Sequence, residues 1–150
     1  MFISDLLSVE KIHCDVKISS KKHLLELISK ELSRDSGQLG QREVFENLFA
    51  RERLGSTGLG KGVAIPHARI KGSDQVEALF LRLKKPVPFD ASDGQPVDLL
   101  FAMTVPEDCS EDHLKLLAQV ARIFSDEELR KKLRAAESPN EILRLLSAAR

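Results

Sequence analysis

A glycine-rich segment that leads to a histidine is the part of this chain best suited to chemistry. Four of the eight glycines lie at positions 55, 58, 60 and 62, and an apolar run then leads to Pro66 and His67. Glycine permits positive φ angles and a close approach of the backbone to a bound group, and amide N–H groups in a concave turn bind anions. Because a neutral imidazole nitrogen can accept a phosphoryl group covalently, we predict a phosphoryl-handling site with His67 as its nucleophile.

His67 also has an ordinary interpretation, as a lone surface or core-edge histidine at the end of a strand. Two features favour the functional one. Pro66 restricts its own backbone and that of its predecessor, so His67 is presented from a stiffened chain. An unperturbed imidazole has a pKa of about 6.5, so most histidine side chains of this kind are neutral and nucleophilic at cytosolic pH.

The same segment nearly matches the P-loop of nucleotide hydrolases. Gly55, Gly60 and Lys61 satisfy the spacing G-x-x-x-x-G-K, but Gly62 stands where the motif requires Ser or Thr. A P-loop also joins a strand to a helix, whereas here a predicted helix precedes the loop and a predicted strand follows it. The sequence therefore disfavours nucleotide hydrolysis, while anion binding by the loop remains the expectation.

Three basic residues and a second histidine are possible companions of His67. Arg51 lies near the end of a predicted helix, where it either complements the helix dipole or grips phosphoryl oxygens with its planar guanidinium group. Arg53 is an alternative that sequence alone does not exclude, and Arg69 is a weaker one. His113 lies in the first turn of a later helix and is either an exposed polar residue or a second imidazole that contacts the phosphoryl group.

The overall composition is that of one globular domain spanning residues 1–150. Lys plus Arg and Asp plus Glu number 23 each, and this zero net charge argues against nucleic-acid binding. The two cysteines, Cys14 and Cys109, form no C-x-x-C pair and are interpreted as reduced thiols. We expect no metal or cofactor, and we interpret His13 and His23 as surface residues.

No signal peptide is evident at the start of the chain. No apolar run approaches the roughly 20 residues that a membrane-spanning helix needs. We therefore expect a cytoplasmic protein without direct membrane insertion.

Hydrophobic periodicity predicts helices over 19–34 and 41–54 and from Ser110 onward. Ser20 is expected to cap the first helix and Gly37 to stop it. Possible capping boxes begin at Ser125 and at Ser138. The expected inward residues are Leu24, Leu25, Leu27, Ile28 and Leu32 in the first helix, Val44, Phe45, Leu48 and Phe49 in the second, and Leu114, Leu117, Ala118, Ala121 and Phe124 in the third.

Strands are predicted over 62–70, 76–83 and 98–105. The second is expected to stop at Lys84-Lys85-Pro86, and the third is apolar almost throughout, which is typical of a strand buried on both faces. Helices, then strands, then helices indicate an α/β fold, a single domain with a mixed sheet sandwiched between helices.

Together these residues resemble a known family. The run from Gly55 to His67 is similar to the signature G-S-T-G-[LI]-G-x-G-[VI]-A-[IV]-P-H of phosphotransferase-system (PTS) IIA proteins of the fructose, mannitol and nitrogen-regulatory type. The resemblance includes Arg51-Glu52, the run 95–101, Val105-Pro106 and His113-Leu114, and covers essentially the whole chain. It is greatest to the nitrogen-regulatory branch, in which the domain is free-standing, without appended IIB or IIC parts.

The resemblance implies specific roles. His67 matches the histidine that takes a phosphoryl group from a histidine-phosphorylated HPr-like (NPr) carrier, and Arg51 and His113 match its flanking side chains. The loop that contacts the phosphoryl group corresponds to Ser56, Thr57, Gly58 and Gly60. The family fold is the mixed sheet sandwiched by helices. This sequence departs from many members at Lys61 and at Ala68.

The expected function is therefore that of a phosphocarrier with a role in nitrogen, carbon and potassium regulation. A sugar-specific IIA that passes phosphate to a IIB cysteine would use the same chemistry on His67. A third interpretation is a binding module for regulatory proteins, which phosphorylation switches. A hydrolase using paired histidines is disfavoured, because no carboxylate is placed to orient either ring.

Overall fold

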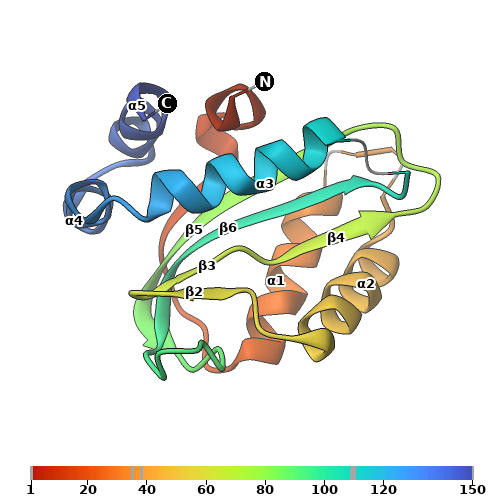
Figure 1. Ribbon diagram of the computed structural model, residues 1–150, viewed down its shortest axis with the longest axis horizontal. Helices are drawn as coiled ribbons and strands as arrows, with labels where there is room; N and C mark the ends of the chain where they lie inside the picture. Colours follow the sequence, from red (N-terminus) through yellow and green to blue (C-terminus); the bar gives the residue numbers. More distant parts are fainter. Residues whose placement is uncertain (1, 35, 38, 109–110, 150) are drawn as a thin grey trace.

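The computed structural model describes residues 2–34, 36–37, 39–108 and 111–149. Two short 3-10 helices, η1 and η2, precede the first strand, and two helices, five strands and three helices then follow in succession (Figure 1). In chain order the elements are η1 (Ile3–Leu6), η2 (Val9–Lys11), β1 (Ile12–Val16), α1 (Lys21–Ser33), α2 (Gln41–Leu54), β2 (Gly58–Gly60), β3 (Val63–Ala64), β4 (His67–Ile70), β5 (Glu77–Val87), β6 (Val97–Pro106), α3 (Glu111–Phe124), α4 (Glu127–Ala135) and α5 (Pro139–Ala148).

The six strands form one mixed sheet with β5 and β6 at its centre. These two strands pair antiparallel, and β1 runs parallel to β5 at one edge. On the other side of β6, β3 and β4 pair with it one after the other, both in parallel, and β2 lies antiparallel to β3. β6 is buried along nearly its whole length, as its apolar sequence predicts. The predicted α/β class with a mixed sheet is therefore confirmed.

Helices cover both faces of this sheet (Figure 1). Leu24 and Ile28 of α1 and Leu48 of α2 belong to one core, while α3, α4, α5 and η1 contribute to a second core on the opposite face. Side chains alternate between the two faces along a strand. Since Ala68 and Ile70 of β4 belong to the α1–α2 core, the side chains of His67 and Arg69 project toward the other face.

Two of the three predicted helix caps are confirmed. The Ser20 hydroxyl accepts a hydrogen bond from the backbone N–H of His23 at 3.1 Å, and Ser138 accepts from Glu141 at 3.2 Å. The cap predicted at Ser125 is wrong by one residue. Asp126 takes that role, because its carboxylate accepts the N–H groups of Glu128 and Leu129, and an acidic oxygen at a helix N-terminus also favours the dipole.

The buried stripe of α3 is rotated from the predicted one. Its buried residues are Leu116, Val120, Ile123 and Phe124, whereas Leu114 is 53% exposed. Apolar residues occupy much of the circumference of this helix, so periodicity alone does not select the inward side. Phe49 of α2, also predicted inward, is exposed. The predicted start at Ser110, and Cys109 before it, lie outside the described residues.

The predicted strand boundaries are wrong at several places. The strand expected over 62–70 is two strands, β3 and β4, separated by Ile65-Pro66, because proline has no N–H for the ladder. β5 runs through Lys84-Lys85-Pro86 to Val87, and a register shift there removes the need for an N–H at Pro86. The short strands β1 and β2 were not predicted.

Candidate active site

The ring of His67 is held in one orientation by the chain just before it. Its Nδ1 lies 2.8 Å from the carbonyl oxygen of Ile65. A carbonyl oxygen only accepts hydrogen bonds, so Nδ1 carries the proton and Nε2 carries the lone pair in this tautomer. The side chain is half-buried at the start of β4. The lone pair of the His67 ring therefore lies on Nε2 and not on Nδ1.

The backbone of Ile65 is in turn fixed by Thr57. The N–H of Ile65 donates to the carbonyl oxygen of Thr57 at 3.1 Å, and the Thr57 N–H donates to the Glu52 carboxylate at 3.2 Å. The Thr57 hydroxyl donates to the other oxygen of the same carboxylate. A continuous set of hydrogen bonds thus runs from the last turn of α2, through the glycine-rich loop, to the ring of His67.

Glu52 is an unexpected member of the site, because it is a buried carboxylate. Its side chain is 4% exposed and forms an ion pair with Lys21 of α1 at 3.1 Å. The Lys21 ammonium group also donates to the carbonyl oxygen of Phe89 at 3.3 Å, lies 4.4 Å from the centre of the Phe89 ring and pairs with Asp90 at 3.6 Å. A buried charge needs such partners. The only sequence signal for Glu52 is its place beside Arg51 in the family resemblance.

The electrostatic surroundings favour a neutral His67. Burial is the main cause that lowers its pKa below the usual value, and the positive charges of Arg51 and Arg69 lower it further. The hydrogen bond to Ile65 and the charge of Glu52 act in the opposite direction but do not outweigh burial. The structure therefore brings Arg51 and Arg69 within electrostatic range of the ring.

Arg51 extends from the C-terminal end of α2. Its Nη1 donates to the carbonyl oxygen of Gly55 at 2.8 Å, so the guanidinium group is held over the entrance to the glycine-rich loop. This single bond leaves its other N–H groups for a further acceptor. Arg53 lies on another side of the helix, with its guanidinium carbon 6.0 Å from the centre of the Phe49 ring.

The hydroxyl groups of the loop are directed inward. Ser56 Oγ donates to the carbonyl oxygen of Phe89 at 2.7 Å and accepts the N–H of Gly58 at 3.0 Å. Gly58 is needed for close packing, since an added Cβ would lie 2.7 Å from the Cβ of Ala91. Ser56 therefore anchors the loop to Phe89 by a hydrogen bond, and Gly58 lets the loop pack closely against Ala91.

The turn that follows β2 is held by two distant side chains. Gly60, Lys61 and Gly62 all have positive φ angles, and the Lys61 N–H donates to Asp93 at 2.8 Å. Arg134 of α4 donates to the Lys61 carbonyl oxygen at 2.7 Å and also pairs with Asp98 at 2.9 Å. This arrangement connects the C-terminal helices to the hairpin that precedes His67.

The fold places His113 on the same side of the sheet as His67. It lies three residues before the buried Leu116, on the sheet-facing side of α3, and is partly exposed. It lines a groove of about 640 Å³ with Asp112, Lys115, Leu116, Ala118, Gln119 and Arg122. The contacts described for the His67 ring do not include His113.

Metal and membrane features are absent from the part of the chain that the structure describes. There, His, Cys, Asp and Glu side chains form no group of three or more with the geometry to hold a metal ion. Within the same residues, every helix is too short or too polar to cross a bilayer. The glycine-rich loop follows a helix and contains a strand, which is the reverse of the P-loop arrangement.

Comparison with known proteins identifies the family of this chain. Residues 5–149 match the model of the phosphoenolpyruvate-dependent sugar phosphotransferase system, EIIA 2. The chain belongs to this EIIA 2 family. A nitrogen regulatory protein of Bradyrhizobium diazoefficiens is 42% identical over 147 residues, which cover 98% of this chain and 95% of that protein. The crystal structure of nitrogen regulatory protein IIA-Ntr from Neisseria meningitidis superposes with a TM-score of 0.91 at 44% identity, covering 96% of this chain and 98% of that one.

Relatives and structures with sugar-specific names share less sequence identity with this chain. The fructose-specific EIIA component of Haloferax volcanii is 32% identical over 146 residues, covering 97% of this chain and 94% of that protein. A complex of enzyme IIA mannitol with phosphorylated enzyme IIB mannitol from Escherichia coli matches with a TM-score of 0.79 at 21% identity, covering 95% of this chain and 97% of that one, and this likeness concerns the fold alone. The predicted resemblance to the nitrogen-regulatory branch is confirmed.

Proposed function

We propose that this protein is a cytoplasmic phosphocarrier that accepts a phosphoryl group on His67 from a histidine-phosphorylated HPr-like (NPr) protein. The observation that carries the proposal is the bond from Nδ1 to the Ile65 carbonyl oxygen, which leaves the Nε2 lone pair for attack. The greater identity to nitrogen regulatory proteins than to fructose-specific ones favours a role in regulating nitrogen, carbon and potassium metabolism.

The transfer is an in-line displacement at phosphorus. The bond from Nε2 of His67 to phosphorus forms as the phosphorus–nitrogen bond of the donor breaks, and the donor nitrogen keeps the electron pair. Arg51 supplies a guanidinium group for the equatorial oxygens. We assign His113 to the opposite wall of the site, and the loop from Ser56 to Gly60 to the placement of the backbone around the phosphoryl group. Catalysis then comes mainly from positioning.

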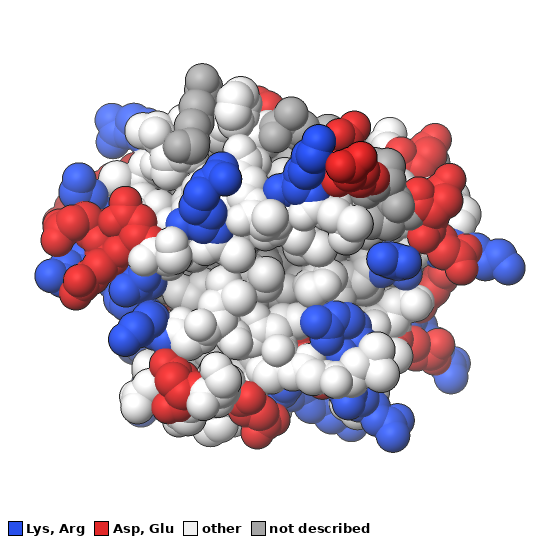
Figure 2. Space-filling model, in the orientation of Figure 1, with Lys and Arg blue, Asp and Glu red and all other residues white. Residues whose placement is uncertain are grey.

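The surface around the site suits a protein donor. Figure 2 shows a mostly uncharged surface over β2, β3 and β4, interrupted by a few Lys and Arg side chains, with acidic groups toward the edges of the view. Leu54 is 86% exposed and Leu59 is 43% exposed, beside the loop that leads to His67. Exposed leucines within a mostly uncharged surface are compatible with contact to another protein.

Two other functions use the same site. One is transfer of the phosphoryl group to the cysteine of a sugar-specific IIB domain. A protein of this fold, enzyme IIA mannitol, forms a complex with phosphorylated enzyme IIB mannitol. The other is regulated binding of target proteins, since a phosphoryl group on His67 adds negative charge to the apolar face. Regulated binding is compatible with the phosphocarrier role, and the stronger resemblance to nitrogen regulatory proteins favours it over sugar transfer.

The proposal is tested by incubating the protein with a phosphorylated carrier and mapping the modified residue by mass spectrometry under alkaline conditions, because acid hydrolyses the phosphoramidate. Phosphorylation of His67, and its loss in the His67→Ala variant, are the expected results. Unchanged labelling of His67→Ala would refute the proposal. The His23→Ala variant removes another histidine, outside the site, and serves as the control.

A further inference from the structure

A positively charged hollow lies at the sheet edge opposite to the His67 loop. It forms where β1 ends and α1 begins, and its volume is about 420 Å³. The sheet order places β1 beyond β5 and β6, whereas β4, which carries His67, lies on the other side of β6. The residues that line the hollow are Lys17, Ile18, Ser19, His23, Lys84 and Lys85. We call it the lysine pocket.

A bulge in β5 places two of these lysines at the pocket. Arg82 pairs with Leu99 and Val87 with Val97, so residues 83–86 lie opposite a single residue of β6. Lys84 and Lys85 lie in this bulge and are exposed. Because Val16 of β1 pairs in parallel with Leu83, Lys17 comes to the level of Lys84. Bulges of this kind commonly re-aim side chains near binding sites.

The positive charges of the lysine pocket are not neutralised by the protein. Within the described part of the chain, the ammonium groups of Lys17, Lys84 and Lys85 form no ion pair, whereas the nearby Lys21 pairs with both Glu52 and Asp90. Asp15, the acidic residue closest in sequence, contacts Arg82 instead. Like charges held close together repel one another, and a bound anion would offset that repulsion.

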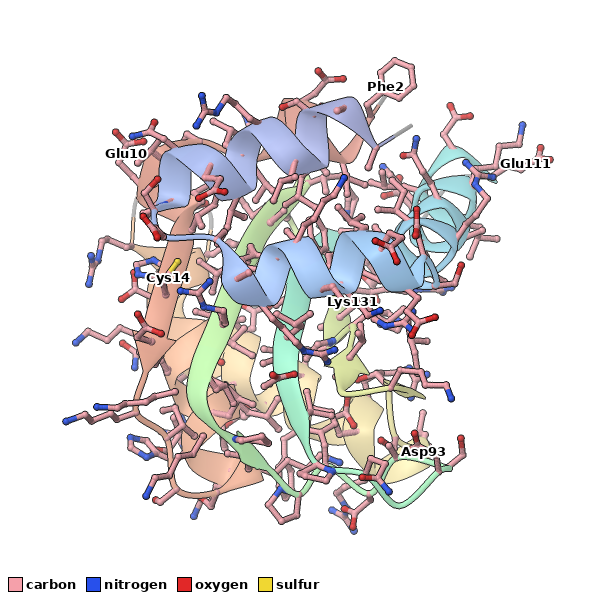
Figure 3. All side chains as sticks on the ribbon, turned by 90° about the vertical axis from the view of Figure 1, so that its left-hand side faces the viewer. Phe2, Glu10, Cys14, Asp93, Glu111 and Lys131 are labelled. Carbon is pink, nitrogen blue, oxygen red and sulfur yellow. The ribbon has the colours of Figure 1, made fainter. Side chains whose placement is uncertain are left out.

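The shape and chemistry of the pocket define its ligand. Its volume lies in the range of small-molecule sites, which is roughly 300–1,000 Å³. Lysine binds phosphate as a point charge, and three unpaired lysines around one hollow favour several linked phosphates over a single one. We propose that the lysine pocket binds a small polyphosphate, either free or as part of a nucleotide. In Figure 3, side chains that end in nitrogen gather at the lower left, where β1 ends.

The test is calorimetric titration of the full chain with sodium tripolyphosphate and, separately, with ATP, each without added metal. Saturable binding is expected, and the double variant Lys84→Gln/Lys85→Gln should weaken it by about tenfold or more. The matched control is Lys30→Gln/Lys132→Gln, which removes two exposed charges elsewhere and should leave the affinity nearly unchanged. Tighter binding of ATP than of tripolyphosphate would identify the nucleotide as the source of the phosphates, and equal binding would identify the phosphate chain alone.

The proposed His67 site also attracts phosphate, so both titrations are repeated in the Arg51→Ala background and followed by amide chemical shifts. The proposal predicts that binding persists there and shifts residues 17–23 and 83–86. No saturable binding in the millimolar range, equal weakening in both double variants, or shifts confined to residues 51–67 would each overturn it. The single variant Lys17→Gln, at another exposed position, provides an independent test and should also weaken binding.

Discussion

The chemistry proposed for this protein depends on which nitrogen of His67 is free to react. The Ile65 carbonyl oxygen holds Nδ1 at 2.8 Å and so selects the tautomer with its lone pair on Nε2. Burial and the neighbouring arginines keep the ring neutral by lowering its pKa. A neutral, oriented imidazole needs no separate base to act as a nucleophile.

The first prediction concerns the pH dependence of phosphoryl acceptance. Only neutral His67 has a lone pair on Nε2, and burial lowers its pKa below the usual value of about 6.5. Acceptance should therefore still exceed half of its maximum at that pH, and its midpoint should lie at lower pH. An NMR titration of the His67 ring, in parallel with initial rates at each pH, provides the measurement. A midpoint at or above the usual value would contradict it.

The second prediction compares two arginines at the end of α2. Arg51→Ala should slow acceptance by about 10- to 100-fold, because a charge-assisted hydrogen bond contributes about 1.5–3 kcal/mol. It should also raise the pKa of His67, since the positive charge of Arg51 lowers it. Arg53→Ala removes the same charge from the same helix end and should leave both quantities nearly unchanged. Equal slowing in the two variants would refute the role of Arg51.

The residues of the candidate site are predictable from sequence to different degrees. His67 and Arg51 are recognisable because their chemistry is unusual beside a glycine-rich loop. The role of the Ile65 carbonyl group is not recognisable from sequence, since every residue has a carbonyl group and only the fold brings this one to the His67 ring. Glu52 was not predicted because an acidic residue beside a phosphoryl site is unfavourable until Lys21, from another helix, neutralises it.

At the scale of elements, the hairpin of β2 and β3 depends on a turn with unusual backbone angles. Gly62 has a φ of 81°, and its carbonyl oxygen accepts the N–H groups of both Asp98 and Leu99 at 3.0 Å. The guanidinium group of Arg134 packs directly against its Cα, because an added Cβ would lie 2.4 Å from Arg134 Nη2. The turn therefore requires glycine for two independent reasons.

The third prediction separates those two reasons. Gly94 also has a positive φ, of 72°, but an added Cβ there would meet nothing within 4 Å. Gly94→Ala should lower the free energy of unfolding by only about 1–2 kcal/mol, which is the cost of placing a residue with a Cβ at positive φ. Gly62→Ala should lower the free energy of unfolding by more than this, because it also displaces Arg134 from Lys61 and Asp98. Denaturant unfolding of the two variants gives the comparison, and equal losses would contradict the role of Arg134.

The fourth prediction concerns the contact between α1, α2 and the loop. Glu52→Gln should destabilise the protein by about 1–3 kcal/mol, since it leaves the part-buried Lys21 without its main partner. It should also lower the pKa of His67 further, because the charge of Glu52 raises it. The control is Glu46→Gln on the same helix, which breaks an exposed pair with Arg42 and should cost less than about 1 kcal/mol. Chemical denaturation and the NMR titration measure both effects, and an unchanged His67 pKa would contradict this account.

Long, strongly periodic elements were predictable and short ones were not. The helix at 41–54 was predicted with its observed ends, because its buried residues recur at helical spacing and Gly55 follows it. β2 and β3 contain three and two residues, too few to show a period. The inward side of α3 depends on the sheet beneath it, since the helix has apolar residues around much of its circumference.

At the scale of the whole molecule, the sheet separates two layers of helices. The proposed His67 site and the lysine pocket lie at opposite edges of this sheet. The layered α/β fold follows from the order of helices and strands and from the apolar sequence of β6. The sequence does not predict that β3 and β4 both pair with the same central strand. That pairing depends on a break at Pro66, which periodicity does not reveal. With a net charge of zero, the chain depends on local groups of basic residues to attract anions.

The most direct test of the account is NMR of the phosphorylated protein with nitrogen-15 in its histidines. The account predicts one phosphorus-coupled nitrogen, Nε2 of His67, because Nδ1 is held by the Ile65 carbonyl oxygen. The His67→Ala variant should show no such coupling. Phosphorus bonded to Nδ1 of His67, or to any other histidine, would contradict the central claim.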